Sequence, residues 1–204
     1  MTSFTISAVI REIGNAEYNF ENIPFSPGDC VIDIGANVGI ISIYLAKKYP
    51  FLKIYSYEPV KRNYLNLMKD LELNGIPGGT IIAENKAVTK DNRKINMNFD
   101  ICNSGGSFSE EAITYRNNAY YTTSLINSIT LDDIFKKYSI NKLKLLKIDC
   151  EGSEYKILYK TKNLSKISFI RGEFHCPAES EEASRLLEYC KRFVSNVSVQ
   201  INNS

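Results

Sequence analysis

The sequence predicts an α/β fold with a doubly wound, mostly parallel sheet that carries an antiparallel hairpin insertion. Two observations support this prediction. The stretch 30–40 begins with a short β-branched apolar run and continues through a glycine turn into a helical pattern, as expected for a buried strand that opens a βα unit. Further short apolar segments, most of which alternate with helical patterns as in βαβ units, lie at 53–58, 80–88, 143–150 and 166–176.

Helix boundaries are marked by prolines, a glycine and a capping pattern. Pro50 stops the first helix, and Gly75 suits the position just after the second. Thr130-x-x-Asp133 resembles a capping box and predicts the start of a third helix. Helices are therefore expected over 40–49, 60–74, from 130, over 154–162 and over 180–193, with a last strand over 197–201.

The segment 94–130 departs from the strand–helix alternation. Ile95, Met97 and Phe99 alternate with polar residues, which is the pattern of a half-buried strand, and 125–130 is a second strand candidate. We therefore expect an antiparallel hairpin insertion. Its long polar loop over 102–124 is predicted to form part of an acceptor site, and the alternative is solvated disorder in the free protein.

Length and composition are those of an ordinary globular chain. At 204 residues, one domain over 1–204 is expected, with 1–29 as an N-terminal lead-in that contains a short helix over 5–13. A net charge of +2 gives no nucleic-acid signal, and no apolar run approaches membrane-spanning length. The five cysteines are scattered and odd in number, so we expect reduced thiols in a cytoplasmic protein.

The glycine turn carries the first candidate site. Its pattern is Asp33-x-Gly35-x-x-x-Gly39, which lacks the Gly-x-Gly-x-x-Gly spacing of nicotinamide-dependent oxidoreductases. Glycines let a ligand approach the backbone closely, although a tight turn that binds nothing is the alternative. The string resembles motif I of the class I S-adenosylmethionine-dependent methyltransferases. This resemblance implies that the methionine part of the cofactor lies against Asp33, Gly35, Ala36, Asn37 and Gly39.

The ends of the second and third strands supply further cofactor candidates. Glu58, followed by Pro59, lies roughly twenty residues after the glycines, where an acidic residue accepts hydrogen bonds from ribose hydroxyls in doubly wound folds. A solvated charge at the strand end is the alternative. Asn85 and Ala87 are expected beside the adenine, but Asn85 fits a turn residue equally well.

Acidic residues and the single histidine follow the fourth and fifth strands. Asp149 and Glu151 follow the fourth strand, while Glu173 and His175 close the fifth. Because the carboxyl ends of parallel strands border one crevice, we expect these side chains to meet there. Methylation of a hydroxyl needs aligned reactants and a base, and Asp149 is the candidate for that base as well as a cofactor contact.

The neighbours of Asp149 have alternative roles. Glu151 and Glu154 are expected to orient Asp149, to bind a sugar hydroxyl or to contact the sulfonium, although Glu154 also suits the start of the next helix. His175 and Glu173 point to one face of their strand, so His175 is a candidate base or acceptor ligand, with a structural role as the equal alternative. We expect no metal, because these acidic residues form no recognisable metal-binding loop.

The string Lys147-Ile148-Asp149-Cys150-Glu151-Gly152-Ser153-Glu154 resembles the Lys-Ile-Asp-x-Glu-Gly-x-Glu pattern of the FkbM-type methyltransferases. The segments 85–88, 130–133 and 173–175 fit the same family, so the resemblance extends over about residues 26–195. It implies a Rossmann-like sheet, S-adenosylmethionine as cofactor, and O-methylation of sugars or other hydroxylated metabolites. One departure is that a single strand is evident after the last helix, where the family has a hairpin; either the sheet is smaller or a partner subunit completes it.

The leading functional prediction is an S-adenosylmethionine-dependent methyltransferase acting on a hydroxyl of a small molecule or glycan. An RNA methyltransferase is one alternative, supported only by a modest lysine cluster over 136–144 that a solvated face also explains. A non-catalytic cofactor-binding subunit is another. We expect neither a membrane nor a nucleic-acid partner, and a homo-oligomer is left open.

Overall fold

The computed structural model describes residues 18–100, 107–109, 121–177 and 180–203. Two expectations lie outside the described residues: the helix over 5–13 and most of the loop over 102–124.

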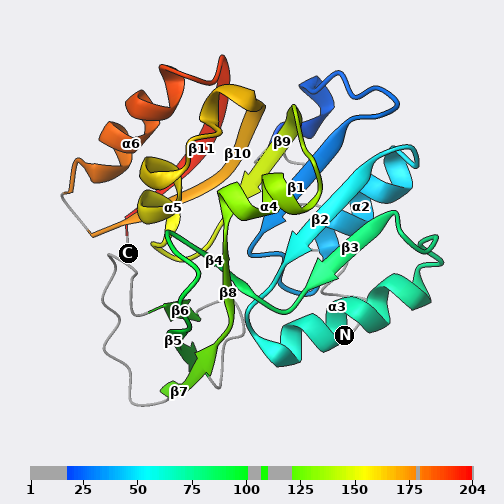
Figure 1. The fold of residues 1–204 in the computed structure, drawn as a ribbon, viewed down its shortest axis with the longest axis horizontal. Coiled ribbons are helices and arrows are strands. Elements are labelled where there is room, and N and C mark those ends of the chain that lie inside the picture. Colours follow the sequence, from blue (N-terminus) through cyan, green and yellow to red (C-terminus); the bar gives the residue numbers. More distant parts are fainter. Residues whose placement is uncertain (1–17, 101–106, 110–120, 178–179, 204) are drawn as a thin grey trace.

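A six-stranded parallel sheet forms the centre of the fold (Figure 1). Its strand order is β11-β10-β9-β1-β2-β3, and each neighbouring pair is parallel. The chain runs outward from β1 in one direction and from β9 in the other, so the adjacent ends of β1 and β9 mark the point where open α/β sheets bind ligands. The strands are β1 (Cys30–Ile34), β2 (Lys53–Tyr57), β3 (Ile81–Glu84), β9 (Leu143–Ile148), β10 (Ile167–Cys176) and β11 (Asn196–Asn203).

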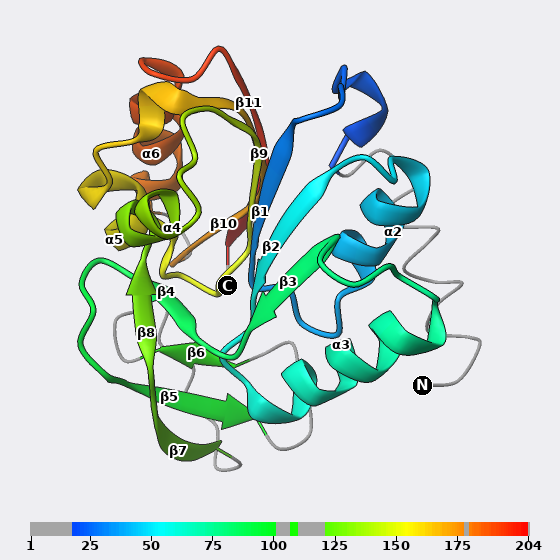
Figure 2. The same cartoon turned by 45° about the vertical axis from the view of Figure 1, so that its right-hand side comes forward.

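Helices cover both faces of this sheet (Figure 2). Val31 packs in one hydrophobic cluster with residues of α2 and α3, while its neighbour Ile32 packs in a second cluster with residues of α4, α5 and α6. Successive side chains of a strand point to opposite faces, so both faces of β1 are buried. The predicted doubly wound α/β fold is confirmed. The helices are α2 (Ile40–Lys48), α3 (Lys61–Leu73), α4 (Leu131–Lys137), α5 (Glu154–Lys160) and α6 (Glu182–Lys191), with 3-10 turns at Phe20–Asn22 and Leu164–Lys166.

Two segments that were each predicted to form one continuous strand are divided between two strands. The segment 80–88 forms β3 in the central sheet and then β4 (Ala87–Thr89), which pairs with β8 (Ser128–Thr130) outside it. Asn85 explains the division, because its side-chain amide donates to two carbonyl oxygens at the end of β2, each at 2.9 Å, and the chain turns there. The segment 125–130 is likewise split between the end of β7 (Tyr121–Ile126) and β8.

The insertion is antiparallel, as predicted. β5 (Ile95–Asp100) pairs with β7 and with the short strand β6 (Phe108–Ser109). Ile95 and Met97 are buried and Asn96 between them is exposed, which confirms the alternation in the sequence. In Figures 1 and 2 these strands lie beyond the carboxyl ends of the central strands, on the side where a ligand would enter.

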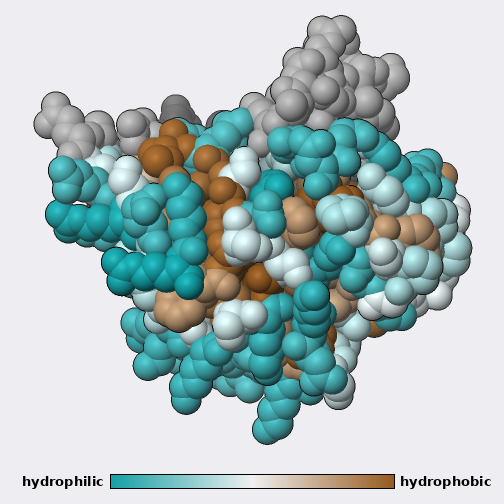
Figure 3. Space-filling view, turned by 90° about the horizontal axis from the view of Figure 1, so that it is seen from above, coloured by the Kyte–Doolittle hydropathy of each residue, from teal (hydrophilic) through white to brown (hydrophobic). Residues whose placement is uncertain are grey.

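The predicted helix start at Thr130 is confirmed by its side chain, which accepts a hydrogen bond from Asp133 N at 3.0 Å. All four described cysteines are free. Among the described residues, every helix is too short or too polar to cross a bilayer. The face shown in Figure 3 is largely hydrophilic, with apolar side chains gathered in a central band.

Candidate functional site

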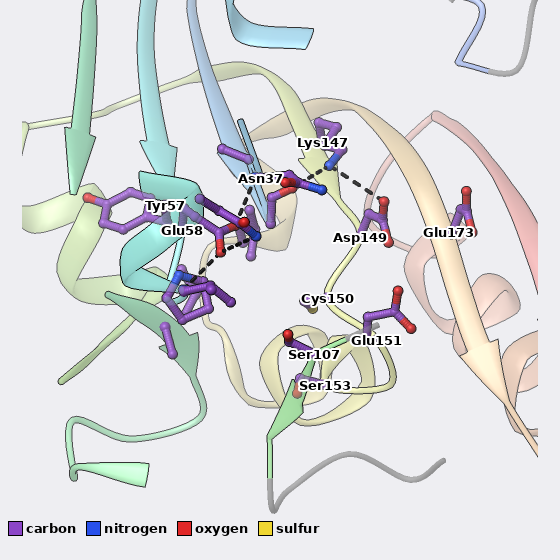
Figure 4. Close-up of a pocket in the computed structure, with 18 of the residues that line it drawn as sticks. Asn37, Tyr57, Glu58, Ser107, Lys147, Asp149, Cys150, Glu151, Ser153 and Glu173 are labelled. Carbon is purple, nitrogen blue, oxygen red and sulfur yellow. Dashed lines mark hydrogen bonds and ion pairs between the residues drawn. The ribbon is translucent and has the colours of Figure 1, made fainter. Parts of the chain in front are cut away.

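A cavity of about 360 Å³ lies at the carboxyl ends of β1, β2, β9 and β10, a size within the range of small-molecule sites. The glycine turn and the strand ends form most of its wall, the insertion adds Ile95, Met97 and Ser107, and the lead-in adds Tyr18. Figure 4 shows Asn37 and Glu58 on one side and Lys147, Asp149, Glu151 and Glu173 on the other. Residues from distant parts of the chain therefore meet in one space, as the strand-end argument predicts.

Both turn glycines have left-handed backbone conformations, with φ of 76° at Gly35 and 85° at Gly39. A Cβ atom on Gly35 would lie 1.9 Å from the carbonyl oxygen of Asp149, and one on Gly39 would lie 2.8 Å from Leu67 Cγ. Gly35 thus allows the turn after β1 to touch the loop after β9. Asn37 also has a positive φ, 51°, which is uncommon for a residue with a side chain. The turn is therefore shaped by close backbone approach within the protein itself.

Asp33 lies beneath the turn and not in the cavity wall. Its carboxylate accepts a hydrogen bond from Ser42 Oγ at 2.6 Å and faces Lys147 Nζ at 3.4 Å. Lys147 is 3% exposed, donates to the carbonyl oxygen of Gly35 at 2.9 Å and lies 3.7 Å from Asp149. Burial lowers the pKa of Lys147, but Asp33 and Asp149 raise it above its ordinary value, so the ammonium stays charged. The expected direct contact between Asp33 and a cofactor is corrected: Asp33 fixes Lys147, and Lys147 borders the cavity.

Glu58 directly follows β2, and its side chain lies in the cavity wall. Its Oε2 accepts a hydrogen bond from Asn37 N at 2.8 Å and its Oε1 accepts one from Val60 N at 2.9 Å. Burial raises the pKa of Glu58 to about 7, even though these two backbone donors favour the charged form. A carboxylate oxygen accepts more than one hydrogen bond, so both oxygens keep capacity for ligand hydroxyls.

The expected adenine residues behave differently from one another. Ala87 and Pro59 line the cavity, where they form an apolar wall together with Val60 and Val88. Asn85 does not line it, because its amide holds the carbonyl groups of Glu58 and Pro59. The turn role, which the sequence left open for Asn85, is therefore the one that the structure supports.

His175 is 2% exposed and lies among four carboxylates. Its Nδ1 is 3.2 Å from Glu154 Oε1, and its Nε2 is 3.5 Å from Glu173, 3.7 Å from Glu151 and 4.0 Å from Asp149. Burial lowers the pKa of His175, but the hydrogen bond to Glu154 and the nearby carboxylates outweigh it and raise the pKa to about 9. The ring therefore carries a positive charge at neutral pH in the free protein.

The loop between β9 and α5 fixes this group. Glu154, 0% exposed, accepts a hydrogen bond from Cys150 N at 2.8 Å with the same Oε1 that faces His175. Glu151 has φ of 54°, a left-handed conformation that costs energy for a residue with a side chain. The structure thus places Glu154 against His175, although the sequence suggested that it orients Asp149.

Most predicted site residues reach the cavity. The candidates that line it are Asp149, Glu151, Glu173 and His175 from the acidic strand ends, with Gly35, Ala36, Asn37, Glu58, Pro59 and Ala87 from the cofactor set. The candidates that lie behind it are Asp33, Gly39 and Asn85.

Sequence reasoning missed Lys147 and Tyr18 as cavity residues. Lys147 could have been found from its position, because a lysine two residues before Asp149 in an apolar strand shares its face and must be paired when buried. Tyr18 stacks on Phe20 with ring centroids 5.3 Å apart, and nothing in the local pattern places it over the distant strand ends.

Comparisons with known proteins agree with this geometry. A family model described as the methyltransferase FkbM domain matches residues 33–195. Methyltransferase sdnD of Sordaria araneosa is 26% identical, over 69% of this chain and 62% of its own length. Methyltransferase 1 of Beauveria bassiana is 27% identical over 29% of this chain and 24% of its own length.

Among solved structures, the crystal structure of methyltransferase FkbM from Methylobacillus flagellatus KT matches with a TM-score of 0.56 at 17% identity. The match covers 86% of this chain and 40% of that one, and it shows a shared fold. This chain thus spans 62% of the length of the first curated relative and 40% of that of the solved structure.

Proposed function

The chain belongs to the FkbM methyltransferase family, and we propose that it is an S-adenosylmethionine-dependent methyltransferase that acts on a hydroxyl group of a small molecule or sugar. One observation carries the proposal: the glycine turn and Glu58 share a cavity with the carboxylates that follow β9 and β10. The first set suits a nucleoside with an amino-acid tail, and the second suits a hydroxylated acceptor that must lose a proton.

The turn side of the cavity fits the cofactor. Glu58 has acceptor capacity for two ribose hydroxyls, and Pro59, Val60, Ala87 and Val88 offer apolar surface to a flat base. When bound, S-adenosylmethionine supplies an activated methyl group. The protein then has to align donor and acceptor and to take up the acceptor proton.

Asp149 is the best placed residue to take up that proton. Its side chain is 27% exposed at the cavity, and the Lys147 ammonium at 3.7 Å holds one of its oxygens. His175 is less suited to this task at neutral pH, because its pKa of about 9 leaves the ring already protonated. We assign Asp149 as the general base and Lys147 as its positioning residue.

Calorimetry with S-adenosylhomocysteine, S-adenosylmethionine and NAD⁺ tests the cofactor. We expect both sulfur compounds to bind and NAD⁺ not to bind, and Glu58→Gln to weaken binding about tenfold through the loss of charge-assisted hydrogen bonds. Glu188→Gln is the control, because Glu188 is exposed on α6 and pairs only with Lys191 among the contacts described. Absence of binding, or tight binding of NAD⁺, would contradict the proposal.

A screen of hydroxylated acceptors with a labelled methyl group tests the activity. Asp149→Asn should bind S-adenosylhomocysteine as the wild type does but lose turnover by at least ~100-fold, the usual contribution of a general base. A variant that transfers methyl groups at the wild-type rate excludes Asp149 as the base. A protein that binds the cofactor but transfers no methyl group to any acceptor would fit a non-catalytic subunit instead.

A further inference from the structure

The acidic side of the cavity is formed by Asp149, Glu151, Glu173 and His175. The proposed methyl transfer gives a role only to the first of these side chains. One ligand atom from each of Asp149, Glu151 and His175 lies within 4.8 Å of the others. The two carboxylates come from the loop after β9, and the histidine comes from the end of β10, so two neighbouring strands build the group. Figure 4 shows both carboxylates beside Glu173, which also belongs to β10.

The histidine is oriented as a ligand. Its Nδ1 is held by Glu154, so a neutral ring with its proton on Nδ1 would direct the bare Nε2 lone pair toward three carboxylates. The distances from Nε2 to these oxygens, 3.5–4.0 Å, exceed the ~2.7–2.9 Å of charge-assisted hydrogen bonds. The ring is 2% exposed and lines the same cavity as these carboxylates. A cation that replaces the Nε2 proton would contact the imidazole and the carboxylates together.

Charge leads to the same conclusion. Asp149, Glu151, Glu154 and Glu173 place four carboxylates around one imidazole. Lys147 lies 3.7 Å from Asp149 and is shared with Asp33. The second oxygen of Glu154 is buried and has no hydrogen-bond partner in the described part of the chain. Four carboxylates around one imidazole therefore favour a cation on this side of the cavity.

We propose that Asp149, Glu151 and His175 bind a divalent cation whose open coordination positions receive oxygen atoms of the acceptor. The second half of this statement rests on the proposed function. Asp149 would give the ion Oδ1, which faces His175, and keep Oδ2, which faces Lys147, for the acceptor proton. Imidazole nitrogen suits first-row transition metals and carboxylate oxygen suits Mn²⁺, so this mixed set is compatible with Mn²⁺, the ion used as the probe below. An acceptor with two adjacent oxygens, as in a sugar diol, is the matching substrate class.

The separations between the three ligand atoms suit such a site. With metal–ligand bonds of ~2.1 Å, neighbouring octahedral ligands are ~3.0 Å apart and opposite ones ~4.2 Å apart. Nε2 lies 3.7 Å from Glu151 Oε2 and 4.0 Å from Asp149 Oδ1, and all three ligand atoms lie within 4.8 Å of one another. The side chains therefore have to close by up to about 1 Å to bind one ion. Glu154 supplies the carboxylate–histidine support that metal-ligating imidazoles usually have. The sequence indicated no metal because Asp149 and Glu151 form no recognisable metal-binding loop by themselves, whereas His175 comes from another strand.

Electron paramagnetic resonance of Mn²⁺ added to the chelator-treated full chain tests the site without any need for activity. We expect a single bound ion, and we expect Glu151→Gln and His175→Gln each to weaken binding at least ~10-fold. Glu188→Gln should bind like the wild type. Calorimetry with S-adenosylhomocysteine on the same variants shows that the fold and the turn side remain intact. No bound ion at ~1 mM Mn²⁺, the weakest affinity common for such sites, would overturn the proposal, as would wild-type binding by both variants.

A second measurement separates this inference from the proposed function. If methyl transfer persists unchanged after removal of divalent ions, the role of the cation in acceptor binding is overturned while the methyltransferase function stands. If the protein binds Mn²⁺ but not S-adenosylhomocysteine, the metal site stands and the proposed function fails. Loss of transfer with chelator and its recovery with Mn²⁺, absent in Glu151→Gln, would support both halves of the proposal.

Discussion

The two sides of the cavity satisfy their carboxylates in different ways. On the turn side, Glu58 accepts hydrogen bonds from two backbone N–H groups. On the acidic side, Asp149, Glu151 and Glu173 face one imidazole nitrogen at 3.5–4.0 Å. Backbone donors are fixed and neutral, so the turn side is complete before a ligand arrives, whereas the acidic side gains from an added cation. Loss of a carboxylate should therefore leave a backbone N–H without its acceptor on the turn side, whereas it should reduce repulsion on the acidic side.

Lys147 connects the two sides, and its loss should have the largest effect on stability. Lys147→Met leaves Asp33 buried without its cation, which costs about 3–5 kcal/mol of unfolding free energy for buried pairs of this kind. Chemical denaturation measures the loss. Lys144→Met is a matched control on the same strand, because Lys144 pairs with Asp29 nearer the surface and should cost less than about 1 kcal/mol.

The double variant Lys147→Met with Asp33→Asn sharpens this test. Removal of the orphaned charge should restore part of the stability that Lys147→Met loses. If the two losses simply add, the pairing of Lys147 with Asp33 is not the source of the effect.

The second largest loss of stability is expected at Gly35, where the turn side touches the loop after β9. Gly35→Ala would place Cβ 1.9 Å from the carbonyl oxygen of Asp149 and would also strain a backbone with φ of 76°. We expect a loss of about 3 kcal/mol in unfolding free energy, with weakened S-adenosylhomocysteine binding. Gly75→Ala has the same kind of backbone, φ 64°, with open space around Cβ, and should cost only about 1–2 kcal/mol. Equal losses would show that the close approach at Gly35 does not matter.

The sequence predicted what depends on local pattern. Apolar periodicity and glycine spacing indicated β1, its turn and the helix behind it, and the Thr130 cap followed from a motif of four residues. The placement of Glu58 and Asp149 in one cavity followed from strand ends alone. These features can be predicted without knowing which strands are neighbours, because the carboxyl ends of parallel strands border one ligand crevice.

What the sequence did not predict depends on contacts between elements. The division of the expected third strand arises from the bonds that Asn85 makes to the end of β2, and Asn85 looks the same in sequence whether it turns the chain or faces a ligand. The link from Glu154 to His175 requires the register of β9 against β10. Pairwise contacts of this kind are invisible to periodicity, and they decide which residues position the reactive ones.

The turn side has a pH dependence that the comparison makes testable. Glu58 has a folded-state pKa of about 7, above its ordinary value of 4.5, because burial disfavours its charge. A raised folded pKa means that this residue's contribution to stability is complete below pH 4.5 and is lost as the pH rises through 7. Wild-type unfolding free energy should therefore fall between about pH 5 and 8, and Glu58→Gln should remove that part of the slope.

Binding should show the opposite sign. The ionised form of Glu58 is the better acceptor for ribose hydroxyls, so S-adenosylhomocysteine affinity should rise a few-fold through pH 7 in the wild type and not in Glu58→Gln. Glu84→Gln is the control, because burial of Glu84 is outweighed by its bonds to Lys137 and Lys86, which lower its pKa to about 2. If the pH dependence of affinity disappears in Glu84→Gln and persists in Glu58→Gln, Glu58 is not the residue that titrates.

The smallest expected effect is a gain in unfolding free energy when one carboxylate of the acidic side is removed. It tests the difference between the two sides most directly. Glu151→Gln removes one of four carboxylates around His175 and leaves Glu154 in place, so repulsion falls and the ring keeps its main partner. In metal-free buffer we expect a stabilisation of about 0.5–1 kcal/mol, as is usual when a functional charge is removed.

Glu154→Gln, three residues further along at the start of α5, should instead lose about 1–3 kcal/mol, because it weakens the buried bonds to Cys150 N and His175 Nδ1. Thermal unfolding with and without Mn²⁺ completes the test, since a cation held by Asp149, Glu151 and His175 should stabilise the wild type more than Glu151→Gln. If Glu151→Gln is as destabilising as Glu154→Gln in metal-free buffer, the carboxylates of the acidic side are satisfied without a cation and the contrast between the two sides fails.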